Sequence, residues 1–185
     1  MHRRVGGQGI VQPARGRYDE EEYAIKFFLN RTSFEREEAL YLREDLRRMM
    51  PAVKDIVSNS DGSICDMAGR TFPPAIVIER GEPLDEWALR IEPDFPTILT
   101  VLCHILARLQ QLHSVGIAHR DIKPGNVLWR PKHHSWTLID FGCAAEIGMS
   151  PTPPNDRQPI LSVLQLVCNL FERVGVALLW GPRCM

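Results

Sequence analysis

"HRDIKPGNVLW", residues 119–129, places an Asp, a Lys and an Asn at fixed offsets just before a short apolar run. A second stretch, "TLIDFGCAA" at residues 137–145, is an apolar run that leads into Asp140. Loops at the ends of secondary-structure elements are where catalytic groups are concentrated. Asn126 and Asp140 offer side-chain oxygens of the kind that suits Mg²⁺, which takes few protein ligands together with phosphate oxygens. The two stretches therefore predict a metal-assisted reaction on a phosphate.

Two further groups of the first stretch fit that chemistry. Asp121 is free to orient a hydroxyl nucleophile, and Lys123 can neutralise phosphate charge as it builds. Upstream, Lys26 stands alone in an apolar strand predicted over residues 22–28. A buried cation needs an anionic partner, and the charge-dense helix predicted over residues 33–50 can supply one.

The chain resembles a eukaryotic protein kinase domain. "HRDIKPGN" fits the catalytic loop H-R-D-x-x-x-x-N, "DFG" fits the magnesium loop, and "YAIK" fits the lysine strand of V-A-I-K. The five fixed residues of the catalytic loop would recur by chance at roughly one in a few million starting points at about 5% usage each. The resemblance covers approximately residues 5–145.

This resemblance implies a fold and a division of the chain. The implied fold class is α+β, a two-lobed kinase-like fold with a β-rich N-lobe containing one long helix and an incomplete helical C-lobe. We expect the N-lobe at residues 1–79, the hinge and partial C-lobe at 80–148, and a divergent Pro-rich linker and apolar tail at 149–185.

The resemblance also implies cofactors and roles. ATP and Mg²⁺ are the expected cofactors, with a Ser/Thr protein as substrate, because a Lys two residues after the catalytic Asp is the Ser/Thr-type pattern. Asp121, Lys123 and Lys26 take catalytic roles, and Asn126 and Asp140 take the metal. His119 is expected to be structural, since packing behind the DFG is favoured over acid–base work.

Four glutamates are candidates for the partner of Lys26: Glu35, Glu37, Glu38 and Glu44. Glu38 shares a helical face with Leu42 and Leu46, which favours an inward direction. The kinase helix glutamate is followed four positions on by an apolar residue, which Leu42 supplies. We therefore predict that Glu38 is the partner of Lys26. The alternative is that all four glutamates are solvated surface charges.

"VGGQGIV", residues 5–11, resembles the second half of the kinase phosphate loop. Gly6, Gly9 and Val11 match its second glycine, third glycine and valine, whereas Arg4 stands in the place of the first glycine. The alternative is an ordinary glycine turn.

Apolar residues in three places resemble those that enclose the adenine: Val11, Ala24 and Leu128. An ordinary core role is compatible with the same positions. Glu79 and Gly81 resemble the hinge, where backbone groups pair with the adenine edge.

Composition narrows the class of protein. The 185 residues include 22 Lys and Arg and 23 Asp and Glu, which gives a net charge of −1. The chain therefore lacks the excess of basic residues expected of a nucleic-acid-binding protein. Five cysteines without a CxxC pair indicate reduced thiols, and the N-terminus shows no apolar signal segment. We expect an intracellular, cytoplasmic protein.

Further elements follow from periodicity and turn signals. We predict a hairpin around Asp61-Gly62, a strand over residues 74–79 and a helix over 95–114.

The apolar stretch 160–180 is long enough for a membrane span, but the Glu and Arg inside it favour a buried or amphipathic helix.

No A-P-E follows the DFG in this sequence. We therefore expect a C-terminally truncated kinase domain that phosphorylates peptides slowly or undetectably. Three functions stay open: a Ser/Thr protein kinase, a non-catalytic nucleotide- or partner-binding relative, and a small-molecule kinase of the same fold. Arg120 beside Asp121, with the complete DFG, disfavours the third.

Overall fold

A computed structural model describes residues 4–6, 9–58, 64–65 and 68–148. Contacts divide the chain into two compact units, the first Met1–Gly81 with Ile139–Gly142 and the second Glu82–Leu138 with Cys143–Met185. The division falls after Gly81, two residues beyond the expected lobe boundary, and the DFG segment groups with the first unit. The predicted Asp61-Gly62 turn and the predicted linker and tail at 149–185 lie outside the described residues.

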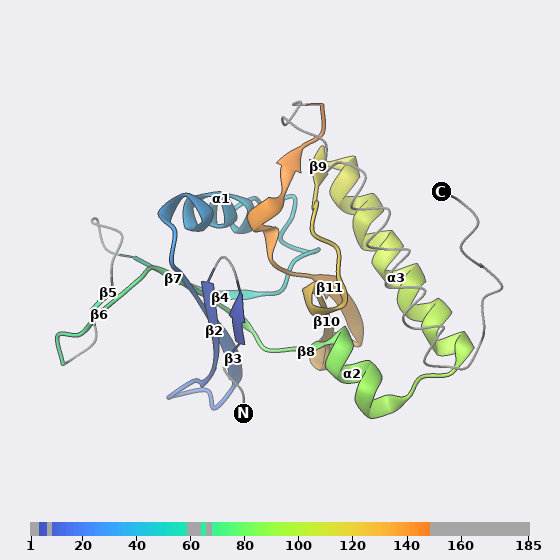
Figure 1. The fold of residues 1–185 in the computed structure, drawn as a ribbon, viewed down its shortest axis with the longest axis horizontal. Coiled ribbons are helices and arrows are strands. Elements are labelled where there is room, and N and C mark those ends of the chain that lie inside the picture. The colour runs from blue at the N-terminus through green and yellow to red at the C-terminus, as the bar shows by residue number, and fades with distance from the viewer. Residues whose placement is uncertain (1–3, 7–8, 59–63, 66–67, 149–185) are drawn as a thin grey trace, which may run out of the picture. The chain divides into compact units, whose positions relative to one another are not determined.

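The first unit is built on one antiparallel sheet in the order β1-β2-β3-β7-β4 (Figure 1). Its strands are β1 Arg4–Gly6, β2 Gly9–Arg15, β3 Glu22–Phe28, β4 Val53–Val57 and β7 Ala75–Glu79. The predictions for β3 and β7 are confirmed, β7 beginning one residue late. Strand β2 was not predicted, because its glycine and proline obscure the period of two.

The predicted hairpin is wrong in its pairing. Strand β4 pairs with β7, whereas β5 Ile64–Cys65 pairs with β6 Thr71–Phe72 in a separate ribbon. An Asp-Gly pair predicts a local turn, but which strand β4 pairs with depends on the rest of the sheet, which this local signal does not contain.

Helix α1 spans Arg31–Tyr41 and is shorter than the predicted 33–50. Asn30 caps its N-terminus: the Asn30 side chain accepts a hydrogen bond from the Ser33 N–H at 3.1 Å. After the helix, Arg43 binds the Asp45 carboxylate twice, at 2.6 and 3.0 Å. Residues two apart do not face each other on a helix, so this pair favours the turns that follow Tyr41.

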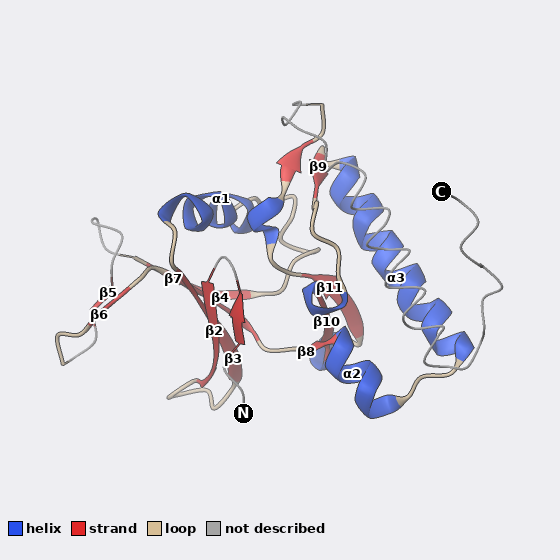
Figure 2. Ribbon diagram, viewed as in Figure 1, coloured by secondary structure: helices blue, strands red, loops and turns tan. Residues whose placement is uncertain are grey.

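The second unit contains most of the described helical residues (Figure 2). Its elements are β8 Glu82–Pro83, α2 Leu84–Ile91, α3 Phe95–Ser114, β9 Ile117–Ala118, β10 Val127–Arg130, β11 Ser135–Leu138 and β12 Ala145–Glu146. The sheet β11-β10-β8 and the two-stranded sheet β12-β9 are antiparallel. The apolar run that ends the stretch 119–129 lies in β10, and the one that begins the stretch 137–145 lies in β11.

Helix α3 matches the predicted range 95–114. Ile98, Val101, Ile105 and Leu112 are buried along one face, and the Arg108 guanidinium donates to the Trp136 carbonyl of β11 at 3.1 Å. Among the described residues, α3 is the one helix with the length and composition to cross a bilayer. Core helices of soluble proteins can meet the same criterion of length and composition.

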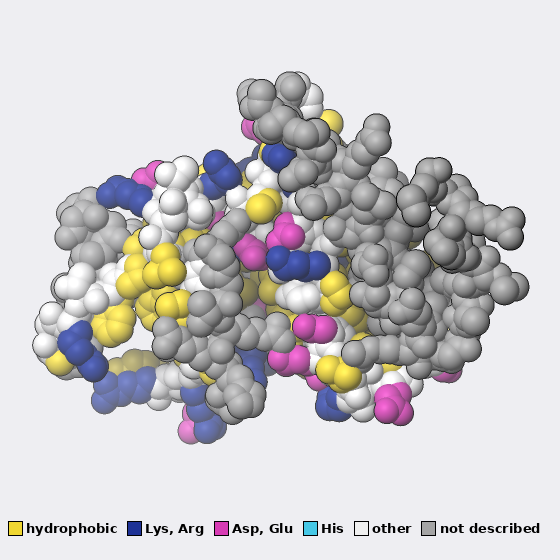
Figure 3. All heavy atoms as spheres, in the orientation of Figure 1, with side chains coloured by type: hydrophobic (Ala, Val, Ile, Leu, Met, Phe, Trp, Pro, Cys, Tyr) yellow, Lys and Arg dark blue, Asp and Glu magenta, His cyan; other side chains and the backbone are white. Residues whose placement is uncertain are grey.

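Helix α2 was missed by the sequence analysis. Its signals are present: Asp85 and Glu86 in the first turn, Arg90 in the last, and Leu84 and Ala88 buried four residues apart. The fold class is α+β, with the sheet-rich unit and the helical unit expected of a two-lobed kinase fold. Side chains of both charges occur on the face in Figure 3, as a net charge of −1 predicts.

Candidate functional site

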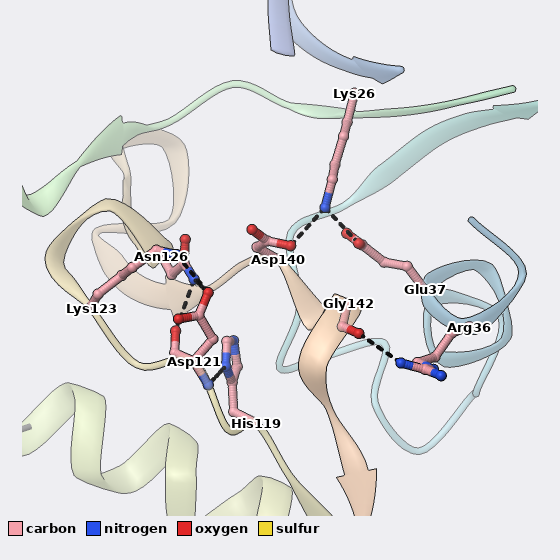
Figure 4. Close-up of polar contacts among 9 residues, drawn as sticks. All are labelled: Lys26, Arg36, Glu37, His119, Asp121, Lys123, Asn126, Asp140 and Gly142. Atoms are coloured by element: carbon pink, nitrogen blue, oxygen red, sulfur yellow. Dashed lines mark hydrogen bonds and ion pairs between the residues drawn. The ribbon is translucent and has the colours of Figure 1, made fainter. Parts of the chain in front are cut away.

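Lys26 lies at the centre of a three-charge cluster in the first unit (Figure 4). Its ammonium is 2.6 Å from the Glu37 carboxylate of α1 and 2.8 Å from the Asp140 carboxylate. The Lys26 side chain is 14% exposed and that of Glu37 is 2% exposed. The predicted anionic partner is thus present, and the two carboxylates come from segments far apart in the chain.

The prediction that Glu38 is the partner of Lys26 is wrong, because Glu37 takes that position. Glu38 was assigned inward with Leu42 and Leu46, but α1 ends at Tyr41. Leu42 is 66% exposed, and Leu46 is buried from a turn beyond the helix. The buried face of α1 carries Phe34, Glu37 and Tyr41. Because the end of the helix was predicted too late, the inward-facing glutamate was assigned one residue too far along the chain.

Burial and charge act against each other in this cluster. Burial lowers the pKa of Lys26, but the attraction of Glu37 and Asp140 outweighs it and leaves that pKa raised. Burial raises the pKa of Glu37, despite the opposing effect of Lys26. With two carboxylates around one ammonium, Lys26 stays protonated, and Glu37 carries a desolvation cost that this attraction does not fully offset.

The DFG segment begins with a residue in an uncommon backbone conformation. Asp140 has φ +65°, in the left-handed region that Asp tolerates better than most side chains. Phe141, which follows, is 1% exposed and packs edge-on against Tyr41, with ring centroids 6.1 Å apart. Burial raises the pKa of Tyr41 well above its usual range, so its phenol stays neutral. Tyr41 therefore anchors the segment that carries Asp140.

The catalytic-loop residues form a second cluster, inside the second unit. The Lys123 ammonium donates to Asp121 Oδ2 at 2.6 Å. The Asn126 amide nitrogen donates to the same oxygen at 2.9 Å and to the Asp121 carbonyl at 2.8 Å (Figure 4). Because both bonds of Asn126 leave from Nδ2, Oδ1 is the atom that it can offer to a cation.

Two neighbours shape that loop. The Asp121 N–H donates to His119 Nδ1 at 3.3 Å, and His119 is 1% exposed. Arg120 has φ +66°, a conformation that costs energy for a non-glycine residue and tends to mark functional loops. The contact gives His119 a structural role in orienting the backbone of Asp121, whereas its expected packing behind the DFG stays a prediction.

The glycines of "VGGQGIV" lie on two paired strands. Gly6 of β1 pairs with Gly9 of β2, and Val11 is the register partner of Lys26 on β3. A Cβ on Gly9 would stand 2.3 Å from the Phe27 carbonyl oxygen. Gly9 is therefore required by the close approach of β3, which is a packing reason independent of any phosphate.

The residues predicted around the adenine are placed as follows. Ala24 of β3 is paired with Ile78 of β7, and Leu128 of β10 is 5% exposed. Glu79 ends β7, and its N–H donates to the Ala52 carbonyl at 2.9 Å, so that donor is occupied within the first unit. Gly81 closes the first unit.

Of the predicted catalytic and metal residues, the first unit brings Lys26 and Asp140 together, and the second brings Asp121, Lys123 and Asn126 together. Glu37 and Tyr41 were missed as site residues. Their signal was the buried spacing of Phe34, Glu37 and Tyr41 at i, i+3 and i+7, which is readable once the end of α1 is known.

Comparison with known proteins identifies a family whose match includes the residues of both clusters. The sequence matches the protein kinase domain family over residues 5–158. It is 34% identical over 90 residues to casein kinase II subunit alpha' of Saccharomyces cerevisiae, covering 49% of this chain and 24% of the relative. It is 49% identical over 47 residues to serine/threonine-protein kinase D of Synechocystis, covering 25% and 9%.

A third relative is the serine/threonine-protein kinase STN7, chloroplastic, of Arabidopsis thaliana, 39% identical over 57 residues, which cover 31% of this chain and 10% of the relative. The chain thus spans about a quarter or less of the length of these relatives. The family match extends over most of the 185 residues and includes both charged clusters. This chain belongs to the protein kinase domain family.

Proposed function

We propose that this chain binds ATP with Mg²⁺ and uses the site for phosphoryl transfer to a Ser or Thr hydroxyl of a protein. The observation that carries the proposal is the Lys26 ammonium held between Glu37 and Asp140 at 2.6 and 2.8 Å. A buried cation fixed by carboxylates on two sides is preorganised to meet phosphate oxygens without reorganisation at the moment of reaction.

The oxygen ligands fit Mg²⁺. Asp140 in the first unit offers a carboxylate, and Asn126 in the second offers Oδ1; each is a hard donor of the kind that Mg²⁺ prefers. In the described part of the chain no group of three His, Cys, Asp or Glu side chains forms a metal cage. Mg²⁺ needs few protein ligands, because it takes the others from phosphate and water. When bound, the ion neutralises charge on the transferred phosphoryl group.

Asp121 is the proposed acceptor of the hydroxyl proton. One of its oxygens is fixed by Lys123 and Asn126, which leaves Oδ1 to receive the substrate hydroxyl. In the reaction the hydroxyl oxygen bonds to the γ-phosphorus, the bond from that phosphorus to the ADP oxygen breaks, and the proton passes to Asp121. Lys123 then offsets charge on the phosphoryl oxygens. The relatives' names, which include serine/threonine kinases, support this acceptor class.

The remaining predicted residues complete the proposal. Val11, Ala24 and Leu128 give apolar surface for the adenine, and Gly6 and Gly9 contribute the backbone of the phosphate loop. With the Glu79 N–H donated to Ala52, the Glu79 carbonyl and the Gly81 backbone are the groups proposed for the adenine edge. Five cysteines without a CxxC pair support an intracellular, cytoplasmic location.

Calorimetric titration with ATP tests this function. We expect Mg²⁺-dependent binding to the unmodified chain and a loss of at least about tenfold in affinity for Lys26→Met, equal to 1.4 kcal/mol. Lys54→Met is the matched control, because Lys54 pairs with Asp19 at the surface. Absence of binding to the folded, unmodified chain would refute the proposal.

A non-catalytic, nucleotide- or partner-binding function is the second candidate. It is favoured by the sequence after the DFG, which contains no A-P-E to place a peptide. Transfer depends on positioning, and a misplaced acceptor costs orders of magnitude in rate. We therefore propose slow or undetectable peptide phosphorylation by the 185-residue chain. Transfer of labelled phosphate to a generic Ser/Thr peptide distinguishes the two functions, and brisk transfer would exclude the second.

A further inference from the structure

Helix α1 is linked to each of the three residues of the DFG segment, indirectly to Asp140 and directly to Phe141 and Gly142. Glu37 and Asp140 share the Lys26 ammonium. The Glu37 carboxylate also accepts from the Phe141 N–H. The third contact comes from the residue before Glu37: the Arg36 guanidinium donates to the Gly142 carbonyl at 3.2 Å (Figure 4).

We propose that Arg36 is a positioning residue that fixes the carbonyl of Gly142 and thereby holds Asp140 in the orientation that serves the metal. This inference rests on the proposed function of the same site. Arg36 touches neither substrate nor metal; it acts through the backbone of the segment.

The backbone of Asp140 explains why the segment needs such a contact. Its φ of +65° lies in a region that non-glycine residues rarely adopt. An uncommon conformation persists when its surroundings over-determine it. Phe141 is held on one side of this point by burial against Tyr41. A bond to Gly142 prevents the chain beyond Phe141 from rotating and carrying Asp140 with it.

The direction of the bond suits a guanidinium. Arg36 is exposed at the helix surface, and its long side chain reaches the carbonyl while the charged group remains partly in water. Charge-assisted hydrogen bonds are stronger than neutral ones. Because Arg36 and Glu37 are adjacent on α1, any displacement of this helix moves the contact to Gly142 and the contact to Lys26 together.

Calorimetry with ATP, with and without Mg²⁺, tests the role. Arg36→Ala should weaken binding about fivefold with Mg²⁺, the effect of losing one partly exposed hydrogen bond, and leave Mg²⁺-free binding unchanged. Arg36→Lys should restore most of the loss. Arg31→Ala is the matched control, because Arg31 lies on the same helix and contacts Glu35 at 2.8 Å.

A merely structural role would weaken binding equally under both conditions. In an Asp140→Asn background, Arg36→Ala should have no further effect on Mg²⁺ dependence, because the residue acts through Asp140.

Equal Mg²⁺-ATP affinity for Arg36→Ala and the unmodified chain would overturn the inference while leaving the proposed function intact. Should Arg36→Ala fail to fold, Arg36→Lys and Arg36→Gln replace it in the test. The inference would be overturned if both variants kept the Mg²⁺ dependence of the unmodified chain and Arg36→Gln bound Mg²⁺-ATP as tightly as Arg36→Lys. No ATP binding by the unmodified chain would refute the proposed function, and the inference with it.

Discussion

The Lys26 ammonium contacts Glu37 at 2.6 Å, so the helix residue that serves this lysine is Glu37 and not its neighbour Glu38. One position along a helix turns a side chain by about 100°. That rotation separates a buried carboxylate from a half-buried one, since Glu37 is 1% exposed and Glu38 is intermediate.

Neutralising Glu37 should impair binding without unfolding the protein. In Glu37→Gln, Lys26 keeps one carboxylate, Asp140, and competes with the metal for it. We expect Mg²⁺-ATP affinity to fall by at least about tenfold, or 1.4 kcal/mol. Glu38→Gln, the matched control one residue away, should change affinity less than about twofold. Equal losses for the two variants in calorimetry would contradict the placement of Glu37.

The raised pKa of Glu37 gives a signed dependence of stability on pH. Burial raises that pKa above its ordinary value of 4.5, so the folded chain binds this proton more tightly than the unfolded chain. The free energy of unfolding of the unmodified chain minus that of Glu37→Gln should fall as pH rises from 4.5 through the folded pKa. Urea unfolding at a series of pH values measures it. A difference that increases with pH over this range would show that the ion pair, not burial, dominates.

Gly9 should not tolerate a side chain. A Cβ at this position would lie 2.3 Å from a backbone oxygen of Phe27, which cannot move without disturbing β3. Gly9→Ala should lower the free energy of unfolding by about 1–3 kcal/mol, as overpacking does. Chemical denaturation measures the change, and an unaltered midpoint would mean that the two strands are further apart than described.

Asp121 should affect transfer and not nucleotide binding. Its contacts go to Lys123 and Asn126 of its own loop, so Asp121→Ala removes the proton acceptor. Any residual peptide phosphorylation should drop by at least about 100-fold, the usual contribution of a general base, while Mg²⁺-ATP affinity stays within about threefold. Phosphate transfer is read with labelled ATP. Unchanged transfer in the variant would remove Asp121 from the proposed role.

The sequence could predict the elements whose signals are local. Helix α3 has a clear apolar stripe and appears at its predicted residues, and β3 likewise, because its β-formers lie between polar turns. The residues of the catalytic loop were identifiable because their spacing is fixed by the chemistry. The pairing of Lys26 with Asp140 was not predicted, since it joins positions 114 residues apart.

Other features depend on contacts that local patterns do not contain. The end of α1 depends on which side chains are buried, and the error there moved the assignment from Glu37 to Glu38. The partner of β4 was decided by a strand beyond the expected turn. The bond from Arg36 to Gly142 spans 106 residues and has no signature in the sequence.

The central claim is that Asp140 and Lys26 form a site for Mg²⁺ and the phosphates of ATP, and the Mg²⁺ dependence of ATP binding in Asp140→Asn tests it most directly. Asn keeps the size of the side chain but loses the charge that a hard cation prefers. Calorimetry should show that Mg²⁺ strengthens ATP binding to the unmodified chain and that this gain is lost in Asp140→Asn, with a residual affinity close to the Mg²⁺-free value. An unchanged gain from Mg²⁺ in the folded variant would contradict the account.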